Sequence, residues 1–113
     1  MDYNNKKFKA VENTENGESS ASTIFHYHQQ GNILHAQYSG GDIEKGYILG
    51  KVDAAGHIDM VYQHINRHGE IRTGKCNSIP YYTENGILRL KEAWQWTNGD
   101  QSTGISEIEE IEP

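Results

Sequence analysis

FHYHQQGNILHAQY, residues 25–38, contains two runs of alternating apolar and polar residues on either side of Gly31-Asn32. Such alternation is typical of half-buried β-strands, and a pair of glycine and asparagine is typical of a two-residue hairpin turn. A two-residue turn fixes which residues face each other, so Tyr27 lies opposite Ala36. The stretch therefore predicts an antiparallel hairpin whose inner face is apolar and aromatic.

Turn signals recur at short spacing along the whole chain. They are ENG (15–17), QGN (30–32), SGGD (39–42), DAAGH (53–57), RHGE (67–70), ENG (84–86) and NGD (98–100). Seven turns imply about eight short strands, and helical spacing of apolar residues is not sustained anywhere. The sequence therefore predicts an all-β chain.

The predicted strands follow one another as a meander, and a meander must protect its two edge strands. Closing the sheet on itself removes both edges. We therefore predict a single domain over residues 1–113, an eight-stranded antiparallel up-and-down barrel, closed or nearly closed and calycin-like in plan. A β-sandwich or an open curved sheet is the alternative, since no sequence feature reports pairing of the first and last strands.

A second hairpin is predicted around Asn16-Gly17, because Asn-Gly supplies the positive φ angles of a type I′ turn. The two-residue turn places Phe8 opposite Phe25 and Ala10 opposite Thr23. Both hairpins send Phe25 to the same inner face. Two independent turns therefore agree on the register of the first three strands.

The turn around Gly69 suits a three-residue loop with this glycine in the left-handed conformation. Such a loop would pair Met60 with Cys76 and Tyr62 with Gly74 on the inner face. A two-residue turn would instead reverse the faces of one strand.

Residues 43–52 leave the inward face undecided. Either the even-numbered residues 46–52 or Ile43, Tyr47 and Leu49 point into the barrel, and the pattern supports both.

The last two strands are predicted from ILRLKEAWQW and the residues after NGD. In the first of them, alternation sends one set of residues inward: Leu88, Leu90, Glu92, Trp94 and Trp96. In the second, Ile105 and Ile108 have opposite parity, which predicts a β-bulge around Ser106.

An eight-stranded barrel is either filled by side chains or holds one small ligand. The residues expected to line the interior and to contact a ligand are Phe8, Phe25, Tyr27, Tyr38, Met60, Tyr62, Glu92, Trp94 and Trp96. The small residues Ala36, Gly46, Gly50 and Gly74 would leave volume between them. This pattern predicts a site for a small apolar or aromatic molecule, although close packing of large against small residues would give the same pattern.

Glu92 is the ionisable group with the most unusual predicted surroundings, because burial of its carboxyl would raise the pKa. One interpretation is structural, with hydrogen bonds to Tyr27, Tyr38, Tyr62 or an arginine near the barrel mouth. The other is general acid–base chemistry together with His64, which is predicted at a barrel end.

Three histidines lie on the outward face of the first quoted hairpin. The register places His28 opposite His35, with His26 two residues along the same strand. Two opposed imidazoles could share a metal ion, but no carboxylate or cysteine completes a ligand set there. We therefore predict no metal site and interpret the face as solvated or as an interface.

Composition excludes several classes of partner. The formal net charge is −6, and no basic cluster lies beyond Lys6 and Lys7, so nucleic acid and anionic membrane surfaces are not expected partners. No apolar run reaches the length of a membrane helix or a signal peptide, and the single cysteine, Cys76, is read as a small buried residue. We expect a cytoplasmic protein without a cofactor.

Several strings resemble one family along nearly the whole chain: NTENGE, YSGGDIEKG, GKVDAAGHIDMVY, NRHGEIRTGKCNSIP and WQWTNGDQSTGISEIEE. The resemblance is to small uncharacterised bacterial proteins that often carry the label N-acetylglutamate synthase. Acetyltransferases of that kind are similar to α/β proteins in which a glycine-rich loop before a helix holds the coenzyme A pyrophosphate. This sequence contains neither the Q/R-x-x-G-x-G/A signature nor a candidate helix, so that activity is not expected.

Three functions are consistent with the sequence. The first is a module that binds a small ligand inside the barrel. The second is a protein-interaction module, including a homodimer, formed through the outward set Ile24, His26, His28, Ile33 and His35. The third is an enzyme that uses Glu92 for acid–base chemistry.

Overall fold

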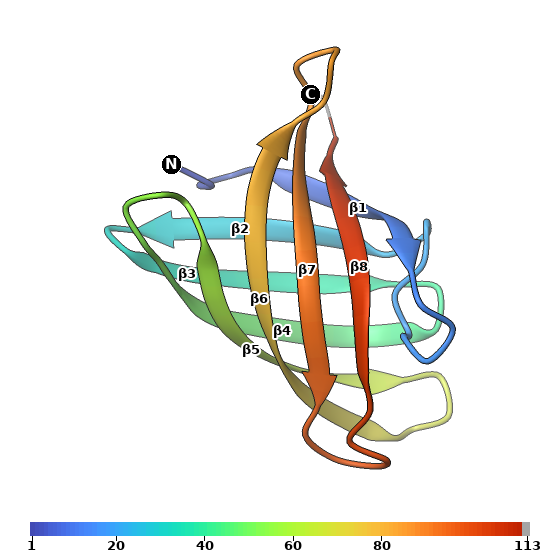
Figure 1. The fold of residues 1–113 in the computed structure, drawn as a ribbon. Helices are drawn as coiled ribbons and strands as arrows, with labels where there is room; N and C mark the ends of the chain where they lie inside the picture. Colours follow the sequence, from blue (N-terminus) through green and yellow to red (C-terminus); the bar gives the residue numbers. More distant parts are fainter. Residues whose placement is uncertain (112–113) are drawn as a thin grey trace.

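Each of the eight strands in the computed structural model pairs antiparallel with the next strand in the sequence, and the last pairs with the first (Figure 1). The strands are β1 (Lys7–Asn13), β2 (Ile24–Gln30), β3 (Ile33–Gly40), β4 (Ile43–Val52), β5 (Ile58–Asn66), β6 (Ile71–Tyr82), β7 (Leu88–Trp96) and β8 (Thr103–Glu110). The structure describes residues 1–111. The predicted closed, up-and-down antiparallel barrel is confirmed.

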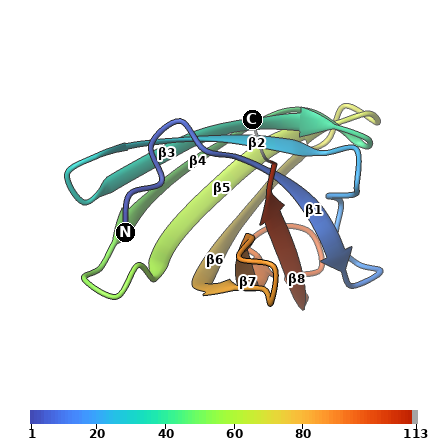
Figure 2. The ribbon, with the colours of Figure 1, turned by 90° about the horizontal axis from the view of Figure 1, so that it is seen from above.

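The barrel is flattened rather than round. In Figure 1, β2 to β4 run across β6 to β8, and Figure 2 shows the same two walls from above. The side chains that alternate inward from both walls form the core. Within residues 1–111, no helix is long and apolar enough to cross a membrane.

Two predicted turns set the register as expected. The turn at Gly31-Asn32 places Tyr27 opposite Ala36, and Gly31 has a positive φ angle of 62°. At the other turn, Gly69 has a φ angle of 75°, which favours glycine. The predicted pairs of Met60 with Cys76 and Tyr62 with Gly74 both form.

The first hairpin has the predicted register at Phe8 but not the predicted turn. The predicted pair of Ala10 with Thr23 does not form in the sheet, because Thr23 lies before the start of β2. Phe8 lies opposite Phe25, yet β1 ends at Asn13 and residues 14–23 form a long loop instead of a two-residue turn. Polar side chains in this segment bind its backbone, as when Asn13 Nδ2 donates to the Ser19 carbonyl oxygen at 3.1 Å. Such bonds compete with strand pairing, so the sheet opens here.

The undecided face of β4 is resolved by an irregularity near its start. The even-numbered residues 46–52 point inward, and Tyr47 and Leu49 are exposed. A register shift between Ile43 and Lys45 turns Ile43 inward as well. Each of the two alternatives was therefore partly right.

The bulge predicted around Ser106 is wrong. Ser106 and Ile108 are both buried, while Ile105 points outward and is 67% exposed, so β8 alternates normally. The register shift lies in the neighbouring strand β1, between Ala10 and Glu12. The opposite parity of Ile105 and Ile108 therefore reflects one exposed isoleucine and not a bulge in β8.

Three glycines of the sheet lie beneath aromatic rings of the adjacent strand. These pairs are Gly46 with Tyr38, Gly74 with Tyr62 and Gly104 with Trp94. A Cβ atom at any of the three would collide with the ring. The expectation that Gly46 and Gly74 leave volume unfilled is therefore wrong, because the tyrosine rings occupy it.

Candidate functional site

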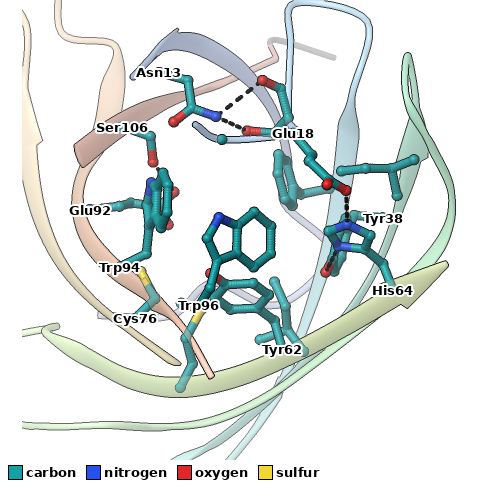
Figure 3. Close-up of a pocket in the computed structure, with 16 residues that line it drawn as sticks. Asn13, Glu18, Tyr38, Tyr62, His64, Cys76, Glu92, Trp94, Trp96 and Ser106 are labelled. Carbon is teal, nitrogen blue, oxygen red and sulfur yellow. Dashed lines mark hydrogen bonds and ion pairs between the residues drawn. The ribbon is translucent and has the colours of Figure 1, made fainter. Parts of the chain in front are cut away.

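A cavity of about 60 Å³ lies inside the barrel beneath the loop of residues 14–23 (Figure 3). Seven of the nine predicted interior residues line it: Phe25, Tyr38, Met60, Tyr62, Glu92, Trp94 and Trp96. The other two, Phe8 and Tyr27, are fully buried in the core but do not line the cavity.

The sequence did not point to several other residues of the cavity wall. They are Asn13, Gly17, Glu18, Ser19 and Ser106, whereas Ile43 and Ile48 belong to the two alternatives left open for residues 43–52. Four of these belong to the loop or to the end of β1 that leads into it, so they follow from the path of the loop. The cavity is thus bounded by both sheet walls and by a segment outside the sheet.

Glu92 lies on the cavity wall and accepts two hydrogen bonds from serine hydroxyls. Ser78 Oγ donates to Oε2 at 2.9 Å, and Ser106 Oγ donates to Oε1 at 3.1 Å. The tyrosine or arginine partners expected from the sequence are therefore replaced by serines of the two strands that flank β7. Burial raises the pKa of Glu92 to about 7, against the opposing effect of the serine bonds.

The interior also contains polar atoms without a partner. Within residues 1–111, buried side-chain atoms without a hydrogen bond are Asn13 Oδ1, the Tyr27 hydroxyl and Arg72 Nε. Buried polar groups are normally paired. Of these three residues, Asn13 alone lines the cavity, so its Oδ1 is the unpaired acceptor available to a ligand or water there. Burial, with the charge of Glu92, raises the pKa of Tyr27, which keeps its hydroxyl protonated.

His64 joins the barrel wall to the loop at the cavity mouth. Its Nδ1 lies 2.8 Å from the Tyr38 hydroxyl, and its Nε2 lies 2.8 Å from Glu18 Oε1. Burial lowers the pKa of His64, which favours the neutral imidazole. Since a carboxylate only accepts, the network assigns the proton to Nε2 and makes Tyr38 the donor to Nδ1.

Glu18 closes the mouth from the loop side. Arg72 Nη1 lies 2.7 Å from Oε2, and Asn66 Nδ2 lies 3.3 Å from Oε1 and 3.4 Å from Oε2. Burial acts to raise the pKa of Glu18, but the hydrogen bonds from His64 and Asn66 and the charge of Arg72 lower it overall. Glu18 is therefore a carboxylate at neutral pH.

His64 and Glu92 do not form the acid–base pair considered from the sequence. Both line the same cavity, but His64 bonds to Tyr38 and Glu18, whereas Glu92 bonds only to serines. The pKa of about 7 leaves Glu92 able to take or give a proton near neutrality. No second titratable group of the described residues 1–111 is hydrogen-bonded to it.

The outer histidines lie side by side as the register predicts. His28 lies opposite His35 with ring centroids 5.0 Å apart, and His26 lies 4.3 Å from His28. Across the described part of the chain, no group of three or more histidine, cysteine, aspartate or glutamate residues is placed to hold a metal ion. Burial, with its histidine neighbours, lowers the pKa of His28.

Comparison with known proteins agrees with the barrel. The model of a family described as "Avidin-like protein" matches residues 1–111. This match says nothing of an N-acetylglutamate synthase. No curated protein and no solved structure matches the chain. Because the family model covers nearly the whole sequence, the chain belongs to the avidin-like protein family.

Proposed function

We propose that this protein binds a small, mainly apolar or aromatic molecule inside the barrel. The observation that carries the proposal is the cavity between the aromatic rings of β7 and the loop of residues 14–23. Apolar walls with a few polar groups are the usual composition of a small-molecule site. Membership of an avidin-like family supports a ligand-binding barrel of this size.

Binding requires the loop to move. A cavity of about 60 Å³ has room for roughly two water molecules, whereas sites for larger ligands are roughly 300–1,000 Å³. The loop of residues 14–23 is the covering element that is not held by strand pairing. We therefore propose that it acts as a lid, and that the closed structure is the ligand-free form.

Trp94 is the residue whose change tests this site most directly, since its ring forms part of the cavity wall. After a screen of small aromatic and apolar compounds by tryptophan fluorescence, Trp94→Ala should weaken the best binder by about tenfold or more. His35→Ala, on the outer face, should leave its affinity unchanged. Isothermal titration calorimetry measures both, with Trp94→Phe as a variant that retains an aromatic wall.

Two results would argue against a lumen site. One is a screen in which no compound perturbs the fluorescence at millimolar concentration. The other is a bound compound whose affinity depends on the outer histidines and not on Trp94.

A second candidate function is self-association through the outer surface of β2 to β5. Leu49 lies opposite His35 and is 59% exposed, and Val61 lies opposite Leu49 and is 58% exposed. Exposed apolar side chains on β4 and β5 therefore lie beside the histidines of β2 and β3. Ile24 and Ile33 are exposed on the same surface. A mixed apolar and titratable surface of this kind suits a symmetric homodimer.

The dimer should weaken at acidic pH, because protonated imidazoles opposed in the interface would repel each other. Sedimentation velocity at pH 8 and pH 5.5 measures this change. Leu49→Lys should give a monomer at both pH values, while Ile105→Lys, on β8 across the barrel, should not. A monomer at pH 8 and high protein concentration would rule out this candidate.

A further inference from the structure

The carboxylate of Glu18 occupies a set of hydrogen-bond donors that the barrel itself supplies. His64 and Asn66 belong to β5, and Arg72 belongs to β6, whereas Glu18 comes from the loop of residues 14–23. Figure 3 shows the Glu18 side chain reaching from the loop toward His64 at the cavity mouth. The loop therefore contributes the anion, and the barrel contributes the site that binds it.

These donors are fixed independently of Glu18. The Tyr38 hydroxyl holds His64 Nδ1, and the carboxylate of Glu70 accepts a second bond from Asn66 Nδ2 at 2.9 Å. The Arg72 guanidinium lies 3.9 Å from the centroid of the Trp96 ring, an arrangement in which the ring face attracts the cation. The site is thus preorganised for a carboxylate.

Glu18 does not use the whole site. Arg72 binds it through Nη1 alone, and Arg72 Nε is buried without a partner. Arginine binds carboxylates best through two parallel hydrogen bonds. A carboxylate freed from the loop backbone could approach Arg72 in that bidentate geometry, which Glu18 does not reach.

We propose that Glu18 is an internal stand-in for the ligand's own carboxylate, and that the barrel binds a small carboxylic acid whose anionic end displaces Glu18 and whose apolar body enters the cavity. The inference rests on the proposed lumen site and adds the chemical class of the ligand. It also makes the loop self-inhibiting, because the site is free only when Glu18 leaves.

The apolar body would contact the residues directly below the donors. Trp96 lies beneath Arg72, Tyr62 packs edge-on against Trp96 with centroids 5.8 Å apart, and Trp94 lies 5.4 Å from Trp96. All three line the cavity. Three aromatic rings this close together favour an aromatic or short branched acid over a long acyl chain, and the loop must open to admit the acid.

The experiment compares benzoate with its uncharged analogue benzamide on the full chain at pH 8. Glu18→Ala removes the competing carboxylate and should tighten benzoate binding by about tenfold or more, because the apparent affinity rises with the fraction of open site. Glu15→Ala makes the same charge change at an exposed position of the same loop and should not. Titration calorimetry measures affinity, and circular dichroism checks that each variant is folded.

A second variant reports on the donors. In Arg72→Gln, the ratio of the affinity for benzoate to the affinity for benzamide should fall to about one, because the charged partner of the carboxylate is lost. Benzoate should also raise the melting temperature of Glu18→Ala more than that of the unchanged chain, since a ligand of the native state stabilises it by mass action. This readout remains useful if Glu18→Ala is less stable.

The outcomes separate the two proposals. If benzamide or another neutral probe binds in a way that needs Trp94, but benzoate binds Glu18→Ala no better than it binds the unchanged chain, the carboxylate inference is overturned and the lumen site stands. If neither probe binds any variant, both proposals fail. The inference is supported if benzoate binds Glu18→Ala more tightly than it binds the unchanged chain, and if adding Arg72→Gln to Glu18→Ala abolishes this increase in affinity.

Discussion

Trp96→Ala is expected to lower the free energy of unfolding by about 3–5 kcal/mol, as large-to-small changes of buried aromatic residues usually do. Trp96 is 3% exposed, and its ring packs against Tyr62 and His64 with centroids 5.8 Å away from each. Its Nε1 donates to the Asn16 carbonyl oxygen at 3.0 Å, which fastens the loop to β7. Urea denaturation followed by circular dichroism measures the loss.

Trp96→Phe separates the packing from the loop contact. Phenylalanine keeps most of the buried ring but cannot donate to Asn16, so the global loss should be smaller. The loop of residues 14–23 should nevertheless open more often, and proteolysis within it should become faster in Trp96→Phe than in the unchanged chain. A loss below about 1 kcal/mol in Trp96→Ala would contradict the place of this ring in the core.

The barrel could be predicted because local chemistry sets the register of its strands. The two-residue turn at Gly31-Asn32 and the left-handed Gly69 each allow one register between the two strands that they connect. The alternation of residues then shows which side chains of each strand point inward. These constraints act between neighbours in the chain. A meander contains almost only such neighbours, so local rules extend to nearly the whole sheet.

The loop of residues 14–23 escaped the same reasoning because Asn16-Gly17 is a strong hairpin signal. The surrounding sequence TENGESSAST carries a second signal, since ten residues with one apolar side chain are more typical of a loop than of paired strands. Long loops are often functional. Even so, composition does not determine the path of the loop over the barrel. The contact of Glu18 with Arg72 joins residues 54 positions apart, so no local pattern indicates it.

Side-chain conformation explains the remaining differences. The pattern correctly placed Tyr62 and Gly74 side by side, but only the structure shows that the tyrosine ring lies over the glycine and fills the space beside it. The cavity is therefore small. In the same way, alternation placed Glu92 inward, but its serine partners depend on the stagger of three strands.

Glu92→Gln is expected to remove a pH dependence of about 3 kcal/mol in stability. The pKa of Glu92 is raised from 4.5 to about 7 in the folded protein, so between these values the folded state binds a proton that the unfolded state has released. The free energy of unfolding therefore falls as pH rises through this window, by about 1.4 kcal/mol per unit of pH. Stability due to the neutral carboxyl is fully present below pH 4.5 and lost above pH 7.

Urea denaturation of both proteins between pH 4.5 and pH 8 measures the difference. A glutamine amide is neutral throughout and can keep hydrogen bonds with Ser78 and Ser106, so Glu92→Gln should match the unchanged chain near pH 4.5 and exceed it by about 3 kcal/mol at pH 8. His64 acts in the opposite direction, since its lowered pKa favours folding as pH rises, but it does so in both proteins and cancels in the difference. Glu84→Gln, at an exposed position, is the matched control. Parallel stability curves for Glu92→Gln and the unchanged chain would mean that Glu92 titrates as an ordinary solvated carboxyl, and the cavity wall would then be wet and open rather than enclosed.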